Sequence, residues 1–327
     1  MEKKNVHVTT GRHVIADPRV SVIMPAYNVA CYISGAIESV LVQTFTAYEI
    51  IVVNDGSPDT DALEESLRPY SDLIVYAIQE HGGVASARNT GLRLAQAPII
   101  AQLDPDDEWF PEFLSTLMAM IEIDPGPDVV YSNAVIFGGT GLDGVQTMKL
   151  SPSIGKVTFD SLVSQKCTVM SSLIGKKDIF FRAGCFDESL HASEDFDMWL
   201  RIIKSGGQIN YHPAPLARYR RRRDSLSADN VLMSESILRV LSKTDRSQKL
   251  TPTERANIAQ SKLKWEAFLN LCEGKRAMVN GNVDLAIDRL TTANQYYRRR
   301  KIALMIKILQ IAPEFALNIL RRRLEDS

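Results

Sequence analysis

The residues best suited to chemistry form an acidic turn, Asp104-Pro105-Asp106-Asp107, which follows a short apolar run. Three carboxylates within four residues repel one another, and such a cluster normally needs a cation. Because the candidate ligands are oxygens with no Cys or His nearby, we expect a hard ion, Mg²⁺ or Mn²⁺, and with it a diphosphate ligand. The alternative is a solvated turn in which an aspartate caps the next helix. The turn alone leaves both interpretations open.

Two further charged segments lie later in the chain. Glu194-Asp195 precedes an amphipathic helical pattern over 196–203, so both carboxylates should project from the first turn of a helix. That position is also explained by the favourable interaction of acids with a helix N-terminus. Arg220–Arg223 are four consecutive arginines that repel one another. They predict either a loop that a diphosphate orders, or a basic strip that meets an acidic partner.

The pattern around these residues predicts alternating strands and helices. Short apolar runs typical of buried strands cover residues 20–25, 48–53, 73–78 and 98–103, and helical spacing follows each run. This alternation favours an α/β fold with a doubly wound, mostly parallel sheet, which binds ligands at the carboxyl ends of its strands. The polar residues that should converge there are Tyr27-Asn28, Asn54-Asp55-Gly56, Glu80-His81-Gly82-Gly83 and the acidic turn.

Charge separates the chain into two parts. The 327 residues carry a net charge of −1, which favours neither nucleic acid nor a strongly acidic partner. Residues 228–327 contain 18 basic and 11 acidic residues, a net charge of +7, whereas residues 1–227 have a net charge of −8. We expect a loose lead-in over 1–19, an α/β domain over 20–227 and a helical region over 228–327. The helices expected in that region cover 230–243, 252–274, 281–296 and 300–323.

Several features bear on location. The four cysteines show no C-x-x-C spacing and are too sparse for a disulfide scaffold, which indicates a reducing compartment. The first residues lack the apolar stretch of a signal peptide, and no apolar run is long enough to span a membrane. We therefore expect a cytoplasmic protein, at most peripheral at the inner face of a membrane. Residues 296–323 carry eight basic residues and one acid, which favours either a solvated face or attachment to anionic lipid.

Five motifs in order resemble those of family 2 glycosyltransferases, which have the GT-A fold. The resemblance covers about residues 20–227, and although each motif is weak alone, the ordered set is specific. The motifs are Pro25-Ala26-Tyr27-Asn28, Val53-Asn54-Asp55-Gly56-Ser57, Gly83-x-x-x-Ala87-Arg88-Asn89-x-Gly91, Leu103-Asp104-Pro105-Asp106-Asp107-x-Trp109 and Glu194-Asp195-x-Asp197-x-Trp199-x-x-Arg201.

The resemblance implies a metal-assisted enzyme that transfers a sugar, with inversion, from a nucleotide-diphosphate sugar to an acceptor hydroxyl. The acceptor would be a glycan, a lipid-linked carrier or a protein, in cell-surface polysaccharide or glycoconjugate synthesis. It implies that Asp195 is the general base and that Asp106 and Asp107 hold Mn²⁺ or Mg²⁺. Residues implied in nucleotide and donor binding are Pro25, Ala26, Tyr27, Asn28, Asp55, Arg88, Asp104, Asp106 and Arg222.

The basic loop departs from the family pattern. Relatives often have Tyr-Arg-x-His-x-x-Ser-x-Ser, and here the histidine position is Arg222. An arginine does not ligate a metal but can clamp phosphate oxygens. Two alternatives to a transferase stay open. A sugar nucleotidyltransferase would need a Gly-rich phosphate loop after the first strand, where Pro25-Ala26-Tyr27-Asn28 stands. A degenerate transferase domain could serve as an interaction module, although the required acids are all present.

Overall fold

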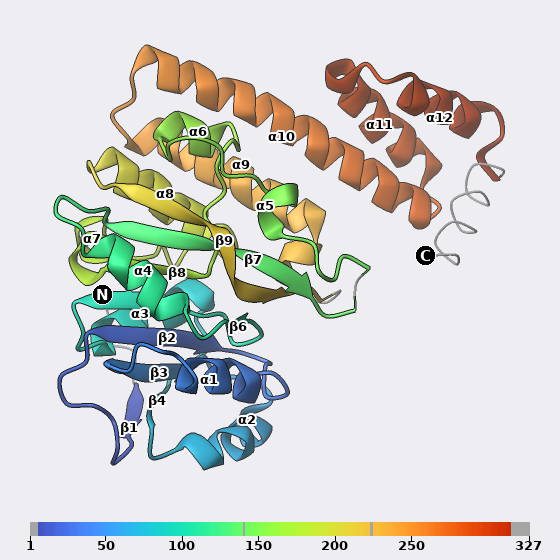
Figure 1. Ribbon diagram of the computed structural model, residues 1–327. Helices are drawn as coiled ribbons and strands as arrows, with labels where there is room; N and C mark the ends of the chain where they lie inside the picture. The colour runs from blue at the N-terminus through green and yellow to red at the C-terminus, as the bar shows by residue number, and fades with distance from the viewer. Residues whose placement is uncertain (1–5, 140, 223–224, 315–327) are drawn as a thin grey trace. The chain divides into compact units, whose positions relative to one another are not determined.

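The structure is a computed structural model that describes residues 6–139, 141–222 and 225–314 (Figure 1). The chain divides into two compact units, Met1–Arg223 and Asp224–Ser327. The boundary expected from the sequence, between residues 227 and 228, lies a few residues later. Each unit has a hydrophobic core made of its own side chains.

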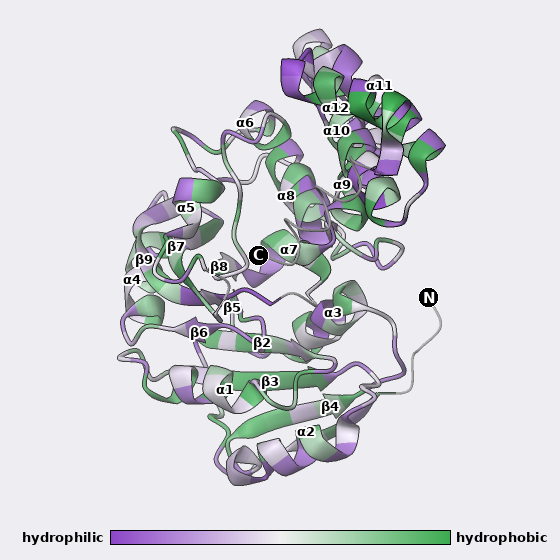
Figure 2. Ribbon diagram, turned by 90° about the vertical axis from the view of Figure 1, so that its right-hand side faces the viewer, coloured by the Kyte–Doolittle hydropathy of each residue, from purple (hydrophilic) through white to green (hydrophobic). Residues whose placement is uncertain are grey.

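The central strands of the first unit are parallel and buried. They are β2 (Val20–Ala26), β3 (Tyr48–Asn54), β4 (Ile74–Ile78) and β5 (Ile99–Gln102). Ile23 of β2 pairs with Ile51 on one side and with Gln102 on the other. Figure 2 shows β2, β3 and β4 as largely hydrophobic ribbons. Strands covered on both faces need continuous apolar runs, which is why these four strands are predictable from the sequence; the four predictions are confirmed.

The lead-in, expected to be loose, contains a strand. β1 (His7–Thr10) pairs antiparallel with β4, and His7 lies opposite Ile78. The backbone N–H of Gly11 continues the pairing by donating to the carbonyl of Ile74 at 3.0 Å. The expectation was wrong for these residues because all four side chains of β1 are exposed. No buried apolar run marks the strand, which is held by backbone hydrogen bonds.

Four more strands extend the sheet beyond β5. They are β6 (Glu108–Trp109), β7 (Val129–Phe137), β8 (Leu173–Lys176) and β9 (Ile209–Arg220), and the strand order is β1-β4-β3-β2-β5-β8-β7-β9-β6. β8 runs antiparallel to β5 and β7, whereas β7 and β9 are parallel. Consequently β1, β6 and β8 oppose the direction of the other strands. The sheet is mixed but mostly parallel, as the sequence predicts.

Helices cover both faces of this sheet. Val22 and Met24 of β2 pack against α1, α2 and α4 in one core, whereas Ile23 points the other way and meets α3. A Cβ at Gly91 of α3 would overlap the side chain of Ile23, so the glycine permits this close approach. The doubly wound arrangement is therefore confirmed. The helices of this unit are α1 (Ile33–Leu41), α2 (Thr60–Leu67), η1 (Arg68–Tyr70), α3 (Val84–Leu94), α4 (Phe113–Ile121), α5 (Thr147–Leu150), α6 (Phe159–Val163), α7 (Lys177–Arg182) and α8 (Glu194–Lys204).

The second unit is helical in the residues described, as expected. Thr251 and Glu254 form a capping box at the start of the longest helix, satisfying backbone donors there. The helices are η2 (Leu226–Ala228), α9 (Asn230–Ser247), α10 (Pro252–Val279), α11 (Val283–Tyr297) and α12 (Arg300–Ile311). Residues 315–323 of the helix predicted over 300–323 lie outside the described residues. No helix in the described part of the chain is both long and apolar enough to cross a membrane.

Candidate active site

The polar ends of the parallel strands meet at one edge of the sheet. Pro25 and Ala26 are the last residues of β2, and Ala26 pairs with Asn54 at the end of β3. Asn54 in turn pairs with Ile78 at the end of β4, while β5 ends at Gln102 on the other side of β2. The loops that follow these strands carry most of the residues predicted to bind a donor. Their proximity is thus a consequence of parallel pairing in register.

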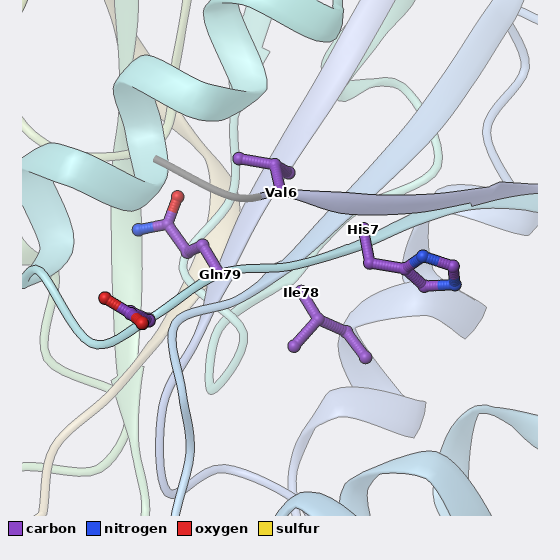
Figure 3. A pocket seen from close by; sticks show the side chains of 5 residues that line it. Val6, His7, Ile78 and Gln79 are labelled. Atoms are coloured by element: carbon purple, nitrogen blue, oxygen red, sulfur yellow. The ribbon is translucent and has the colours of Figure 1, made fainter. Parts of the chain in front are cut away.

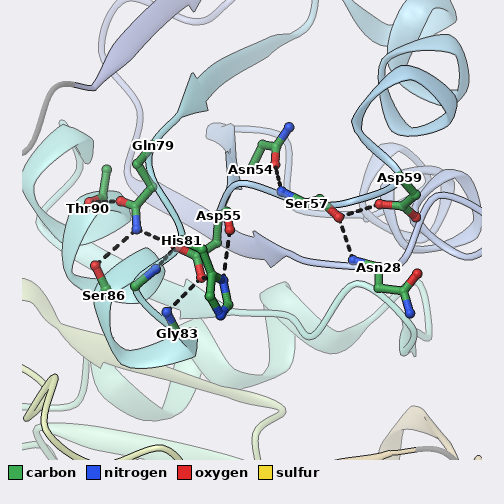
Figure 4. Close-up of polar contacts among 11 residues, drawn as sticks. Asn28, Asn54, Asp55, Ser57, Asp59, Gln79, His81, Gly83, Ser86 and Thr90 are labelled. Atoms are coloured by element: carbon green, nitrogen blue, oxygen red, sulfur yellow. Dashed lines mark hydrogen bonds and ion pairs between the residues drawn. The ribbon is translucent and has the colours of Figure 1, made fainter.

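Asp55 is the centre of a hydrogen-bond network at this edge (Figure 4). Its Oδ1 accepts from Gln79 Nε2 at 2.6 Å and from the N–H of Gly82 at 2.9 Å. Its Oδ2 accepts from the N–H of Gly83 at 2.8 Å and lies 2.9 Å from His81 Nδ1. The side chain of Asp55 is 2% exposed, and Gln79 is held in turn by two hydroxyl groups of α3. Asp55 therefore fixes the loop after β4 before any ligand binds.

Tyr27 provides an aromatic surface beside this network. Its ring is 4.4 Å from the ring of His81, with an interplanar angle of 32°, and Tyr27 is 45% exposed. The next residue, Asn28, is left-handed with φ 55°, and its N–H donates to Ser57 Oγ at 2.7 Å. These contacts tie the loop after β2 to the turn after β3. Together they leave a partly exposed aromatic pair above the Asp55 network, suited to stacking a planar base.

Arg88 joins two acidic segments that are far apart in the sequence. Its Nη2 donates to Asp104 Oδ1 at 2.9 Å, and its Nη1 donates to Glu194 Oε1. The guanidinium also lies 5.6 Å from the ring centre of Phe186. The side chain of Arg88 is 7% exposed, and a cation so buried requires paired charges. The resemblance implies that Arg88 binds the donor, and its position also allows it to brace the acidic cluster. In the described contacts it joins the acidic turn to the start of α8.

Asp195 lies in the first turn of α8, beside the buried Glu194. It is partly exposed, and the N–H of Phe196 donates to its Oδ1 at 2.7 Å. Burial, and then the charge of Asp104, raises the pKa of Asp195 even though Arg88 opposes the shift. Burial, with the charges of Asp195 and Asp104, raises the pKa of Glu194 to about 7, again opposed by Arg88. A carboxylate of raised pKa is a stronger proton acceptor than an ordinary one.

The acidic turn is held by the end of β9. The N–H of Arg220 donates to Asp107 Oδ1 at 2.7 Å, and Arg220 Nε donates to the carbonyl of Asp106 at 2.8 Å. Asp107 is 2% exposed. Burial, then the charges of Asp104 and Asp106, raises the pKa of Asp107 well above its usual range. Burial, then Asp104, also raises the pKa of Asp106, while Arg222 lowers it.

Arg222 lies on the same turn. Its Nε is 3.0 Å from Asp106 Oδ2, with both side chains less than a fifth exposed, at 18% and 17%. The guanidinium also sits 4.9 Å from the ring centre of Tyr32, which Arg220 approaches at 5.0 Å from its own position. Arg220 and Arg222 therefore contact acids of the acidic turn, which is distant in the sequence. The sequence of the basic loop alone does not predict these contacts. Arg223, the last of the four, lies outside the described residues.

The acidic turn suits a divalent cation whose remaining ligands are phosphate and water oxygens. Asp106 and Asp107 offer hard carboxylate oxygens. Burial, and then the charge of Asp104, raises the pKa of each, and a cation would offset the repulsion among these acids. Within the described residues, no group of three or more His, Cys, Asp or Glu side chains could hold a metal ion. Mg²⁺ commonly binds one or two carboxylates together with substrate phosphates and water. The two aspartates thus fit a cation completed by a bound diphosphate.

A pocket opens beside the Asp55 network, at the edge of the sheet (Figure 3). Its volume is about 490 Å³, and it is lined by Val6, His7, Ile78, Gln79 and Glu80. Gln79 belongs to both the pocket and the network. His7 lies in β1 and Ile78 in β4, so part of the pocket wall comes from the segment that the sequence predicts to be a loose lead-in.

Three features of the site escaped sequence reasoning. His81 was noted only as part of a polar strand end, yet it contacts both Tyr27 and Asp55. Arg220 was named only as part of the basic loop, and Tyr32 was not named. No local signal predicts their contact, because it joins residues far apart in the sequence. Trp109, the last residue of the motif that contains the acidic turn, is 3% exposed and stacks on Phe113 at 4.0 Å between ring centres, so it packs in the core.

Comparison with known proteins relates part of the α/β unit to a known family. Residues 21–182 match the model of Glycosyl transferase family 2. An uncharacterized glycosyltransferase of Rickettsia felis is 31% identical over 191 residues, which is 57% of this chain and 32% of the relative. The minor teichoic acid biosynthesis protein GgaB of Bacillus subtilis is 50% identical over 91 residues, 27% of this chain and 10% of GgaB. The chain thus spans about a third or less of these relatives' length.

Solved structures share the fold. The S. aureus protein TarS, residues 1–349 in complex with UDP-GlcNAc, has a TM-score of 0.61 and 18% identity, covering 86% of this chain and 91% of that chain. The mannosyltransferase PcManGT from Pyrobaculum calidifontis, in complex with GDP-Man and Mn²⁺, has a TM-score of 0.59 and 19% identity, covering 97% of this chain and 90% of that chain. The GT-A fold expected from the motifs is therefore confirmed.

Proposed function

We infer the activity of this chain from its family, since residues 21–182 form a Glycosyl transferase family 2 domain. We propose that the protein is a glycosyltransferase that moves a sugar from a nucleotide-diphosphate sugar to an acceptor hydroxyl, with inversion at the anomeric carbon. One observation carries the proposal further than the family alone. Arg88 contacts both Asp104 and Glu194, so the turn proposed to hold the donor and the helix proposed to hold the base are braced together.

The nucleotide is proposed to bind at the ends of β2 and β3. The base stacks on Tyr27, and Asp55 accepts a hydrogen bond from it. Both oxygens of Asp55 already have donors, of which His81 has a side chain 54% exposed. His81 is therefore the donor to Asp55 that an N–H of the base can replace. The base then stacks on the ring of Tyr27, which His81 contacts in the structure. Pro25, Ala26 and Asn28 shape this end of the site, and Asp104 is placed for the ribose.

Transfer is proposed to use Asp195 as the general base. The acceptor oxygen attacks the anomeric carbon from the face opposite the diphosphate, Asp195 takes the hydroxyl proton, and the bond from carbon to the diphosphate oxygen breaks. Burial raises the pKa of Asp195, which favours proton acceptance. The nucleoside diphosphate leaves with the electron pair of the broken bond. We propose that Arg222 stabilises the growing negative charge of this leaving group, since a guanidinium forms bidentate bonds with phosphate.

A divalent cation, Mn²⁺ or Mg²⁺, would be held by Asp106 and Asp107. When bound, it supplies Lewis-acid stabilisation to the leaving diphosphate. PcManGT, a structural neighbour, was solved with Mn²⁺, which supports this assignment. The role of the chain itself is to keep two carboxylates adjacent at the end of β5, with Arg220 fixing Asp107 from the other side.

The acceptor is proposed to belong to cell-surface polysaccharide or glycoconjugate synthesis, on a glycan, a lipid-linked carrier or a protein. Similarity to the teichoic acid protein GgaB supports this class. We propose that the protein works in the cytoplasm, at the inner face of a membrane, through α12. Arg300, Leu304, Lys307 and Ile311 have a spacing that places them on one face of this helix, and Leu304 and Ile311 are 59% and 84% exposed.

A panel of nucleotide sugars tests the proposal. The purified protein is incubated with UDP- and GDP-linked sugars in the presence of Mn²⁺, and the released nucleoside diphosphate is measured. We expect slow release from one donor class. A nucleotidyltransferase would instead release pyrophosphate from a nucleoside triphosphate and a sugar phosphate. A domain that only mediates interactions would release neither product, and that result would refute the proposed activity.

A further inference from the structure

Asp106 already has a positively charged partner from the protein. Arg222 Nε lies 3.0 Å from its Oδ2, and the guanidinium stacks on Tyr32 with 18% of the side chain exposed. This contact is largely shielded from water, so it is stronger than a surface ion pair. The same carboxylate is one of two that could hold a divalent cation. Asp106 therefore faces two candidate counter-ions.

The two arginines at the end of β9 are anchored differently. Arg220 is the last residue of β9, and its backbone N–H donates to Asp107 while its guanidinium lies 4.1 Å from the ring centre of Phe137. Arg222 lies two residues beyond the strand and reaches Asp106 through its side chain. Movement of Arg220 would break strand and turn together, whereas movement of Arg222 leaves the backbone pairing of β9 in place. Arg222 is thus the exchangeable cation.

A second observation concerns the cation itself. Because the described residues contain no group of three or more His, Cys, Asp or Glu side chains able to bind a metal, a bound ion depends on ligands from elsewhere. A diphosphate can supply them, and it also attracts a guanidinium. Arrival of the diphosphate therefore changes the most favourable partner of Arg222 and of Asp106 at the same time.

We propose that Arg222 and a divalent cation are alternative counter-ions of Asp106, exchanged when the donor binds. In the donor-free protein Arg222 neutralises Asp106. When a nucleoside diphosphate binds, Arg222 moves to its phosphates, and Asp106 becomes available to the cation. This proposal rests on the proposed function, because it takes the diphosphate as the ligand. Arg222 thereby couples cation and nucleotide binding, so that each tightens the other by the same factor.

The test measures binding of Mn²⁺ to the full chain from the amount of free Mn²⁺, alone and with saturating UDP or GDP. In the wild type, we expect Mn²⁺ alone to bind weakly and the nucleotide to strengthen binding by roughly tenfold or more, a common size for such coupling. In Arg222→Gln, Asp106 loses its internal partner. Binding of Mn²⁺ alone should strengthen by about tenfold, and the effect of the nucleotide should shrink correspondingly.

Arg221→Gln is the matched control. It removes the same charge from the neighbouring exposed residue, whose backbone N–H bonds the carbonyl of Phe137. A general electrostatic effect would strengthen Mn²⁺ binding equally in both variants and would overturn the exchange. Arg222→His, with the residue often found in relatives, is a second variant if Arg222→Gln does not fold. At pH 8 its mostly neutral ring should also strengthen binding of Mn²⁺ alone.

The outcomes separate the two proposals. If UDP or GDP binds but Mn²⁺ alone has equal affinity for the wild type and both Arg222 variants, the exchange is wrong and the proposed function stands. If the wild type binds neither nucleoside diphosphate with or without Mn²⁺, the proposed function fails and the exchange fails with it. Stronger binding of Mn²⁺ alone to the Arg222 variants, with Arg221→Gln unchanged, supports the exchange.

Discussion

At the scale of single residues, Asp195 is the group whose removal is most informative. It is partly exposed in the first turn of α8, and the proposed mechanism requires it to take one proton. In Asp195→Asn we expect turnover to fall by at least ~10²-fold, the usual contribution of a general base. Nucleotide affinity, measured by calorimetry, should stay close to that of the wild type because the contacts of Asp55 and Tyr27 are unchanged.

Asp178→Asn is the control for this prediction. Asp178 also lies in the first turn of a helix, α7, and its side chain is 66% exposed with Arg182 at 3.3 Å. If helix-dipole stabilisation were the role of Asp195, the two substitutions would change folding stability similarly and leave turnover alike. Comparable turnover in Asp195→Asn and wild type would remove Asp195 from the mechanism.

The pH dependence of turnover follows from the charges around Asp195. Burial and then Asp104 raise its pKa above the ordinary value of about 3.9, and Arg88 opposes them. The base acts when deprotonated, so the rate should be lost as pH falls through this raised pKa. In Arg88→Met the opposing cation is gone, so the acid limb of the kcat–pH profile should move to higher pH. A profile that moves to lower pH, or not at all, would contradict this account.

Arg88→Lys is a second variant for this experiment, in case Arg88→Met does not fold. It keeps a positive charge near Asp104 and Glu194 but cannot form the same pair of directed contacts. We expect an acid limb between those of wild type and Arg88→Met, with a melting temperature nearer to that of wild type. The pH profile separates a charge effect from a packing effect, because packing alone does not move the limb.

The positions of residues were predictable where local pattern decides them. Asp55, Asp104, Asp106 and Asp107 follow strands that the apolar runs predict, so their convergence at one edge could be inferred. The side chains that contact these aspartates could not be inferred from the sequence. The pair of Arg222 with Asp106 depends on where β9 runs in the sheet, and that is set by long-range pairing with β6 and β7. No spacing within the basic loop encodes it.

At the scale of elements, the contact of α3 with β2 depends on Gly91. A Cβ there would overlap the side chain of Ile23, and both lie in the core. We expect Gly91→Ala to lower the free energy of unfolding by about 1–3 kcal/mol, the usual cost of overpacking. Because α3 follows the loop held by Asp55 and carries Arg88, nucleotide affinity should fall as well. Chemical denaturation and calorimetry measure the two effects.

Gly35→Ala is the matched substitution for comparison. Gly35 also lies in a helix, α1, but the nearest atom to an added Cβ is Glu108 Oε1 at 3.6 Å, an ordinary contact. Here alanine should stabilise by up to about 1 kcal/mol because it favours helix over glycine. Equal destabilisation at both positions would mean that close approach to Ile23 does not explain the glycine in α3.

The exposed face of α12 carries a prediction about membranes. Leu304 and Ile311 alternate along this face with Arg300 and Lys307, a pattern that favours contact with anionic lipid. The protein should float with anionic vesicles at low salt and not with neutral ones. The double substitution Leu304→Ser and Ile311→Ser should weaken flotation, whereas Leu263→Ser, at an equally exposed position of α10, should not.

The absence of salt-sensitive flotation in the wild type would leave the basic residues of α12 as a solvated face. The sequence predicted this region as helical and basic, which the described residues bear out as far as Ile311. It could not tell which side chains stay exposed, because that depends on packing against α11 and the core around Leu309. By contrast, β1 was missed because its side chains are exposed and carry no buried pattern.

At the scale of the whole molecule, the two units have separate cores, so a substitution that destabilises one unit should leave the stability of the other unchanged. Gly274 of α10 faces Leu290 of α11, with an added Cβ 2.8 Å from its Cγ. We expect Gly274→Ala to destabilise the second unit by about 1–3 kcal/mol and to leave nucleotide affinity unchanged. Calorimetric unfolding with and without UDP checks this. A loss of nucleotide affinity matching that of Gly91→Ala would show that the units unfold as one.

The strand order has a consequence for the behaviour of the protein at high concentration. The sheet ends on one side in β1, which is four residues long and pairs with β4. An open edge strand offers unpaired N–H and C=O groups on which another chain can add, and short strands make poor templates for such addition. Loss of β1 would expose the longer β4 in its place. β1, which the apolar pattern of the sequence does not predict, therefore protects this edge of the sheet against self-association.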